Sequence, residues 1–305
     1  MQRVTYLSLR SIQATKIGWI LLFPYILLQF SQIPIEPSLM QALTKKNITL
    51  VLGGGGARAM TQVGVIKVLH KAGIKITRIV GVSAGAMMGA LYASNPDPDY
   101  LERITLDTHQ RKLLNITLFR LRKGFVTGEA FQNFITEQTG HKTFETLEVP
   151  FVAVAVDLKT GELIAIDQGE LAPAVNASCA LPPVFHPVNI AGRLLVDGGA
   201  VDPVPVNIAK RYPHDIVIAV NITQQLPDKM PTHAVSTFIR YHKIRLLAQS
   251  LAASEGADIV IHPYVADTHL FDSSQKELLI VEGERATREQ LEKILKLCEG
   301  ACARH

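Results

Sequence analysis

From residue 47 onward, the apolar and polar positions alternate between two kinds of pattern. Short apolar runs rich in β-branched residues indicate buried strands, and between them apolar residues recur at helical spacing. The strands predicted in this way are 47–52, 74–82, 151–156, 163–166, 194–196, 216–220 and 259–261. The predicted helices are a segment around 63–69 that stops at Gly73, a small-residue helix at 84–94, polar helices within 99–149, and an amphipathic helix at 234–253.

Strands that alternate with helices predict an α/β fold with a mostly parallel central sheet covered on both faces. The runs 151–156 and 163–166 flank a turn that contains Gly161, so we expect them to form an antiparallel hairpin. No linker rich in Pro, Gly or Ser follows residue 47. We therefore expect one domain over 47–305, preceded by a separate extension over 1–46.

The extension contains an apolar run at 17–30, interrupted by Pro24 and Gln29. This run is short for a membrane span, which needs roughly 20 apolar residues. Basic residues precede it as in a signal peptide, but the following segment 31–34 is a poor cleavage site. Three interpretations stay open: a membrane anchor, a signal peptide, or leader sequence ahead of a true start at Met40. We expect a cytoplasmic protein, and peripheral or N-terminal attachment to a membrane stays open.

Charge and cysteine content exclude several classes of protein. Residues 1–46 contain five basic residues and one acidic residue, which accounts for the whole net charge of +4. The remainder is neutral, so nothing predicts nucleic-acid binding. Three cysteines without framework spacing argue against a disulfide scaffold. Cys298 and Cys302 lie on a predicted C-terminal helix with only His305 nearby, so we expect structural cysteines and no metal site.

The first chemical motif is the glycine-rich segment 53–58 (GGGGAR), at a predicted strand-to-helix junction. Glycines let backbone N–H groups converge on an anion at a helix N-terminus. A dinucleotide site would need an acidic residue about 20 positions later, and none occurs between Thr61 and Pro96. The Gly-Lys-Ser/Thr sequence of a P-loop is also missing. We therefore expect no nucleotide and no cofactor, and a developing oxyanion as the anion bound here.

The second motif is Gly81–Gly85 (GVSAG), again between a predicted strand and a helix. This arrangement is typical of a nucleophile elbow, in which a sharp turn exposes the serine at the start of a helix. The flanking Gly81 and Gly85 leave room for the neighbouring backbone, and the helix dipole favours the negative charge that develops during attack. The motif predicts Ser83 as a nucleophile.

The third motif is Asp197 followed by Gly198 and Gly199, at the end of a predicted strand. A serine nucleophile needs a proton acceptor, and a carboxylate serves if it bonds the serine directly in a partly dry site. The alternative is a triad in the order Ser…Asp…His. The histidines open to that role are His186, His214, His233, His242, His262 and His269.

The three motifs in this order resemble those of the patatin-like phospholipases, over about residues 47–290. Segments 177–185 (ASCALPPVF), 195–199 (LVDGG) and 203–206 (PVPV) are similar to the bacterial branch of that family. The resemblance implies a patatin-like three-layer α/β/α sandwich, a dyad of Ser83 and Asp197 without histidine, and activity on acyl esters of lipids without a metal.

The resemblance also assigns an oxyanion hole to the backbone amides around Gly54, Gly55 and Gly56, with Arg58 steadying the loop. Ala59 departs from the family pattern, which has glycine there. Alanine would be strained if that position needed a positive φ, but harmless in a first helical turn, which we expect. The alternative function is a non-catalytic lipid- or anion-binding module on the same fold. The expected partner is a lipid acyl ester, and a membrane surface stays open as a second one.

Overall fold

A computed structural model of the chain describes residues 46–107, 128–223, 225–226, 230–265, 268 and 274–300, all within the unit Gln41–His305. The apolar run 17–30, His269 and Cys302 lie outside these residues, as do the three interpretations of the N-terminal extension. No described helix is both long enough and apolar enough to cross a membrane.

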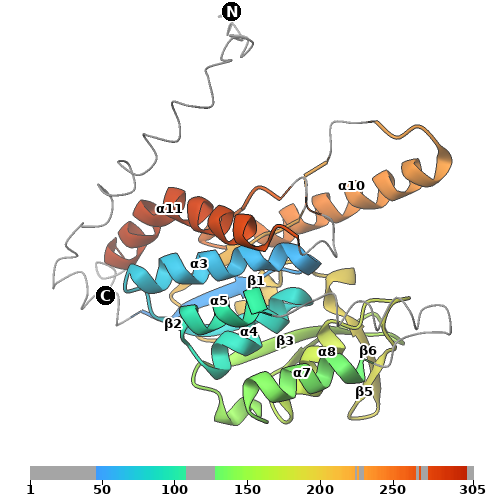
Figure 1. Cartoon of the computed structure of the whole chain (residues 1–305), viewed down its shortest axis with the longest axis horizontal. Helices are drawn as coiled ribbons and strands as arrows, with labels where there is room; N and C mark the ends of the chain where they lie inside the picture. Colours follow the sequence, from blue (N-terminus) through green and yellow to red (C-terminus); the bar gives the residue numbers. More distant parts are fainter. Residues whose placement is uncertain are drawn as a thin grey trace, which may run out of the picture. The chain divides into compact units, whose positions relative to one another are not determined.

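The centre of the molecule is a mixed, mostly parallel sheet (Figure 1). Its strands lie in the order β5-β6-β3-β2-β1-β7-β8, and β4 also pairs with β3. Their bounds are β1 Ile48–Leu52, β2 Ile76–Val82, β3 Phe151–Asp157, β4 Leu163–Ile166, β5 Val188–Ile190, β6 Arg193–Asp197, β7 Ile216–Val220 and β8 Ile259–Ile261. Strands β3, β2, β1, β7 and β8 run parallel, whereas β4, β6 and β5 pair antiparallel. The predicted α/β fold and the 151–156/163–166 hairpin are confirmed.

Helices connect these strands and cover the sheet. They are α3 Met60–Lys71, α4 Ala84–Ser94, α5 Pro98–Asp107, α7 Glu129–Thr139, α8 Leu171–Ser178, α9 Val206–Ala209, α10 Ala234–Ser254 and α11 Lys276–Gly300. The described part of the chain also contains the 3-10 helices η1 Gly56–Ala59, η2 Phe144–Thr146 and η3 Gly198–Ala200. The sequence pattern did not anticipate α8, β5 or α9, because these elements are short.

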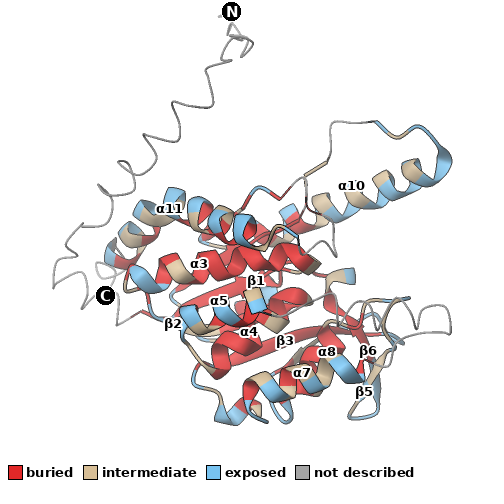
Figure 2. Cartoon of the chain, in the orientation of Figure 1, coloured by how far each residue is buried: buried red, intermediate tan, exposed pale blue. Residues whose placement is uncertain are grey.

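Both faces of the central strands β1, β3 and β7 are buried (Figure 2). Val51, Val80 and Val82 point to one face, where they pack in a cluster with Val206 and Ile208 of α9. On the other face a Cβ added to Gly89 of α4 would lie 2.9 Å from Ile79, so this helix packs closely on β2. Burial on both faces explains why the central strands are continuous apolar runs rather than alternating ones.

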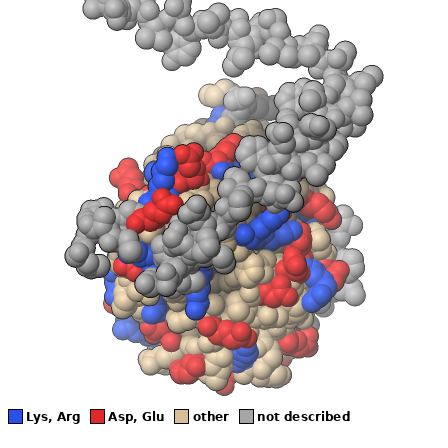
Figure 3. All heavy atoms as spheres, turned by 90° about the vertical axis from the view of Figure 1, so that its left-hand side faces the viewer, with Lys and Arg blue, Asp and Glu red and all other residues tan. Residues whose placement is uncertain are grey.

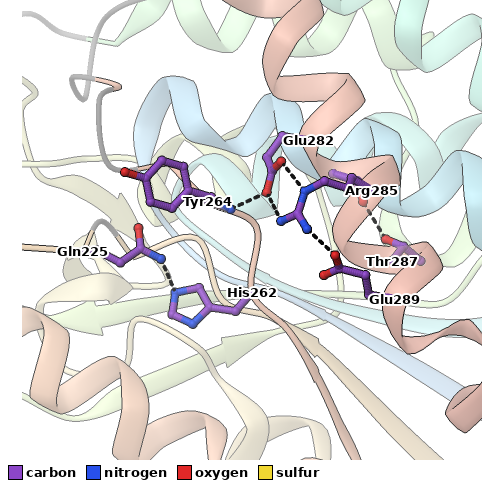
Figure 4. A network of polar contacts seen from close by, with 8 residues as sticks. Gln225, His262, Tyr264, Glu282, Arg285, Thr287 and Glu289 are labelled. Atoms are coloured by element: carbon purple, nitrogen blue, oxygen red, sulfur yellow. Dashed lines mark hydrogen bonds and ion pairs between the residues drawn. The ribbon is translucent and has the colours of Figure 1, made fainter. Parts of the chain in front are cut away.

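Helix α11 packs so closely against α3 that their backbones are in contact. A Cβ added to Gly283 would lie 1.8 Å from the carbonyl oxygen of Thr61, so only glycine fits there. A polar network fixes α11 to the segment after β8 (Figure 4). Glu282 accepts from the Tyr264 amide at 2.6 Å and from Arg285 at 2.7 Å, and the hydrogen bond from Arg285 holds the pKa of Glu282 below its ordinary value. The packing secures α3, which follows the glycine-rich segment.

The description of 234–253 as an amphipathic helix is wrong. Helix α10 covers that segment, but its apolar side chains point to all sides and most are exposed. Only Ser250 and Ser254, in its last turns, are buried among its residues. In Figures 1 and 2 its N-terminal turns extend beyond the helices that cover the sheet.

Candidate active site

Strands β2 and β6 deliver Ser83 and Asp197 to the same point of the sheet. Strand β2 pairs with β3 in parallel up to the pair Val82–Val154. Strand β6 pairs with β3 in the antiparallel direction and ends at the pair Asp197–Ala155. The two strands thus approach along β3 from opposite directions, and their carboxyl ends meet at adjacent residues of β3. This topology brings together side chains that are 114 positions apart.

Ser83 occupies the sharp turn that the second motif predicts. It directly precedes α4 and adopts φ 55° and ψ −130°, a conformation that a residue with a side chain rarely takes. Close packing explains the flanking glycines: a Cβ on Gly85 would lie 2.2 Å from the Leu52 carbonyl oxygen, and one on Gly81 would lie 2.6 Å from that of Gly85. The elbow therefore tolerates no side chain at either position.

Two residues that the sequence motifs did not single out hold the backbone of this turn. The Ser178 hydroxyl accepts from the Ser83 amide at 2.9 Å and donates to the Val154 carbonyl at 2.6 Å. The Cys179 thiol donates to the Ser83 carbonyl at 3.0 Å. Burial raises the pKa of this thiol well above its ordinary value, so it remains protonated. Both residues belong to the 177–185 segment, whose only signal in the sequence was its family resemblance.

The Ser83 hydroxyl donates to Oδ2 of Asp197 at 2.5 Å. The other carboxylate oxygen accepts the Gly199 amide at 2.8 Å, which fixes the orientation of the side chain. Asp197 is only 4% exposed, and burial raises its pKa to about 6, although the hydrogen bonds from Ser83 and Gly199 oppose that rise. Near neutral pH Asp197 is thus ionised, with a pKa closer to that of an effective base than the pKa of an aspartate in water.

The glycine-rich segment lies directly against Ser83, since a Cβ on Gly54 would stand 3.1 Å from the Ser83 Cβ. The Gly54 amide, however, donates to the Pro203 carbonyl at 3.0 Å. This bond removes Gly54 from the expected oxyanion donors. The amides of Gly55 and Gly56 have no acceptor among the described residues. The expected oxyanion hole therefore narrows to these two amides, with Gly54 supplying space beside the nucleophile.

The buried side chains of Arg58 and Gln62 hold the glycine-rich segment in place. The Gln62 side chain donates to the Gly53 carbonyl at 2.8 Å, and Arg58 donates to the Ile222 carbonyl at 3.4 Å. Arg58 is buried, and desolvation lowers its pKa to about 10, so it still carries a charge at neutral pH. Ala59 has φ −61° and ψ −14°, so it lies in the first helical turn without strain, as expected.

Four of the histidines weighed for a triad contact groups other than Asp197. His214 contacts the Tyr212 carbonyl, and His233 caps α10 by accepting the Ser236 amide. His242 packs against the Phe238 ring, and His262 contacts Gln225 (Figure 4). His186 is exposed, and His269 lies outside the described residues. Within the described part of the chain, no group of three His, Cys, Asp or Glu side chains could hold a metal ion.

A family model described as patatin-like phospholipase matches residues 50–210, more than half of the chain. The protein belongs to the patatin-like phospholipase family. This match spans the glycine-rich segment, the elbow and the Asp-Gly-Gly loop, so all three motifs lie within the patatin-like domain.

Relatives share this patatin-like domain within longer chains. An uncharacterised NTE family protein of Mycobacterium tuberculosis is 34% identical over 182 residues, which are 57% of this chain and 49% of the relative. The human patatin-like phospholipase domain-containing protein 6 is 33% identical over 65% of this chain and 15% of its own. The match thus spans about half of the mycobacterial relative and far less of the human one.

Among solved structures, VipD from Legionella pneumophila superposes with a TM-score of 0.50 at 14% identity, over 81% of this chain and 67% of VipD. At this identity the likeness concerns the fold alone. It agrees with the α/β architecture of the patatin-like domain.

Proposed function

We propose that this protein is a serine hydrolase of lipid acyl esters, in which Ser83 is the nucleophile and Asp197 the general base. The observation that carries the proposal is the 2.5 Å hydrogen bond from the Ser83 hydroxyl to the buried Asp197 carboxylate. The backbone conformation of Ser83 and the adjoining glycine-rich segment support it. A binding module without catalysis would not need this combination of features.

In the proposed first half-reaction, the Ser83 oxygen bonds to the ester carbonyl carbon while its proton passes to Asp197. The amides of Gly55 and Gly56 stabilise the oxyanion, each donor contributing roughly 2.7–4 kcal/mol. The N-terminus of α4 adds a favourable dipole. The carbon–oxygen bond to the alcohol then breaks, and the alcohol leaves with the proton from Asp197.

The second half-reaction regenerates the enzyme. A water molecule attacks the acyl-serine and gives its proton to Asp197, and the same two amides hold the second oxyanion. Ser83 leaves with that proton, and the fatty acid is released. In each half-reaction the Asp197 carboxylate first accepts a proton and then donates it. A pKa of about 6 suits both directions of proton transfer near neutral pH.

Activity-based labelling tests the proposal. A fluorophosphonate probe should label the wild-type protein and leave Ser83→Ala unlabelled. Ser94→Ala, at the other end of α4, is the matched serine control and should label like wild type. The wild-type protein should then release fatty acid from at least one of a phospholipid, a lysophospholipid and a triacylglycerol. Labelling of Ser83→Ala, or labelling without fatty acid release from any lipid, would contradict the proposal.

A further inference from the structure

We propose that α10 is the element through which this protein docks on an anionic phospholipid bilayer. The contact face is a stripe of Phe238, Tyr241, His242 and Arg245, which we call the aromatic stripe. These residues follow the spacing i, i+3, i+4 and i+7, so they share one side of the helix.

The aromatic stripe is exposed. Phe238 is 64% and Tyr241 57% exposed, and both rings pack edge to face on His242, with centroids 4.4 and 5.5 Å apart. Ile244, beside the stripe, is 47% exposed. Water-soluble proteins seldom leave so much contiguous apolar surface uncovered without a binding partner. Aromatic rings with a polar edge suit the boundary between acyl chains and headgroups.

The charge of α10 identifies the occupant. The segment 230–254 contains Arg240, Lys243 and Arg245 and no acidic residue. Arg245, on the aromatic stripe, is exposed and forms no ion pair with a described residue, whereas the guanidinium of Arg240 lies on the other side of the helix against the Met230 sulfur. By contrast, basic and acidic side chains are interspersed on the face shown in Figure 3. Long arginine side chains can reach anionic headgroups while their stems lie along apolar surface.

Two other occupants match this charge less well. A second copy that docked through its own α10 would place like charges opposite one another. The apolar run 17–30 of this chain belongs to an extension with a net charge of +4, which would also be repelled. An anionic bilayer supplies both the apolar phase for the rings and the opposite charge.

The aromatic stripe is continuous with a residue of α10 that contacts the segment after the Asp197 loop. Gln249 lies four residues after Arg245 and seven after His242, so it extends the same stripe. Its side chain donates to the carbonyl of Val201, which follows η3 and the Asp197 loop. Docking through the stripe would therefore hold the Asp197 loop near the bilayer. This last step rests on the proposed lipid-ester hydrolysis, whereas docking itself does not.

The first test is sedimentation of the full-length protein with vesicles, in a Ser83→Ala background so that hydrolysis plays no part. The vesicles are phosphatidylcholine alone, or an equimolar mixture with phosphatidylglycerol. We expect binding to the mixture, and a partition coefficient at least about tenfold lower for Phe238→Gln/Tyr241→Gln, which corresponds to about 1.4 kcal/mol. Leu278→Gln/Val281→Gln changes two equally exposed apolar residues of α11 and should bind like the parent.

Charge reversal tests the electrostatic part. Arg245→Glu should lower the preference for phosphatidylglycerol. Lys293→Glu, at an exposed basic residue of α11, is the control and should leave the preference in place. If both reversals lower binding equally, only net charge matters and the assignment to α10 is wrong.

A local probe separates α10 from the N-terminal extension. Trp19 is the only tryptophan, so Trp19→Phe removes the native signal. In that background, emission from Phe238→Trp should shift to shorter wavelength on addition of the mixed vesicles, and emission from Leu278→Trp should not. No shift at position 238, whether or not the protein sediments, would overturn the proposal. So would a wild-type dimer that the Phe238/Tyr241 variant converts to a monomer with unchanged vesicle binding.

Discussion

The backbone amide of Ser83 is held by the hydroxyl of Ser178 at 2.9 Å, and that hydroxyl in turn donates to the carbonyl of Val154. The nucleophile, the end of α8 and the middle of β3 are thereby joined through one fully buried oxygen. The strained turn at Ser83 has no other acceptor for its amide among the described residues. Ser178 is therefore a positioning residue for the proposed reaction.

We predict that Ser178→Ala lowers the rate of fluorophosphonate labelling by about tenfold to a hundredfold, because an unsatisfied buried amide costs about 1–3 kcal/mol and releases the turn. The KM for a soluble ester should change little, while kcat falls. Ser94→Ala removes another buried hydroxyl and should leave labelling unchanged. If both variants lose stability equally and both keep wild-type labelling rates, Ser178 has only a structural role.

We predict that Asp197→Asn inactivates the protein and stabilises it. The pKa of Asp197 is about 6 in the folded state and near 3.8 when unfolded, so the folded state disfavours the charge. At pH 7 the neutral amide should gain up to about 3 kcal/mol in the free energy of unfolding. The gain should vanish below about pH 3.8, where the carboxyl is protonated in both states. Urea unfolding at pH 7 and at low pH measures it.

Asp202→Asn is the matched control for this prediction. Burial also raises the pKa of Asp202 to about 6, but among the described residues its side chain accepts the Val204 amide and not the Ser83 hydroxyl. This variant should gain stability at pH 7 and keep its esterase activity. Inactivity of Asp202→Asn would show that activity loss does not distinguish the base from its neighbours.

The pH–rate profile should follow the ionisation of Asp197. Because only the carboxylate can accept the Ser83 proton, kcat/KM for a soluble ester should fall about tenfold per unit below pH 6. Asp202→Asn should retain the same acid limb. A midpoint near pH 4 would mean that Asp197 titrates as an ordinary solvated carboxyl, in conflict with its burial.

We predict that Gly54→Ala lowers kcat by about tenfold or more, because the new methyl group would stand 3.1 Å from the Ser83 Cβ and displace the nucleophile. The melting temperature should fall only slightly. Gly256→Ala is the control, since the nearest atom to its new methyl group is the mobile end of Lys210. Wild-type kcat in Gly54→Ala would show that Ser83 does not depend on this close approach.

The boundary of the folded domain is a further prediction. A protein that starts at Met40 should keep the wild-type melting temperature and esterase rate, because β1 begins at Ile48 and every catalytic motif follows it. Thermal unfolding and ester hydrolysis of both lengths test this. A large drop in melting temperature would place part of 1–39 in the core.

The sequence by itself determined the fold class and the local chemistry. Buried parallel strands must be apolar throughout, and a glycine-flanked serine between a strand and a helix has few other uses, so 47–52, 74–82 and Ser83 could be recognised locally. The same holds for the 3.6-residue period before Gly73. These signals are strong because backbone conformation and burial act on neighbouring residues.

Only the tertiary structure decided which groups meet. Strands β2 and β6 end beside neighbouring residues of β3, and this arrangement brings the Ser83 hydroxyl to the Asp197 carboxylate. It depends on the order of the strands in the sheet, which no local sequence pattern encodes. The Gly54 amide bonds to the Pro203 carbonyl, and the Ser83 amide bonds to the Ser178 hydroxyl, 95 positions away. Such long-range hydrogen bonds have no local signal in the sequence. The exposure of α10 could not be predicted either, because the sequence of a helix with many apolar residues does not show whether other elements cover it.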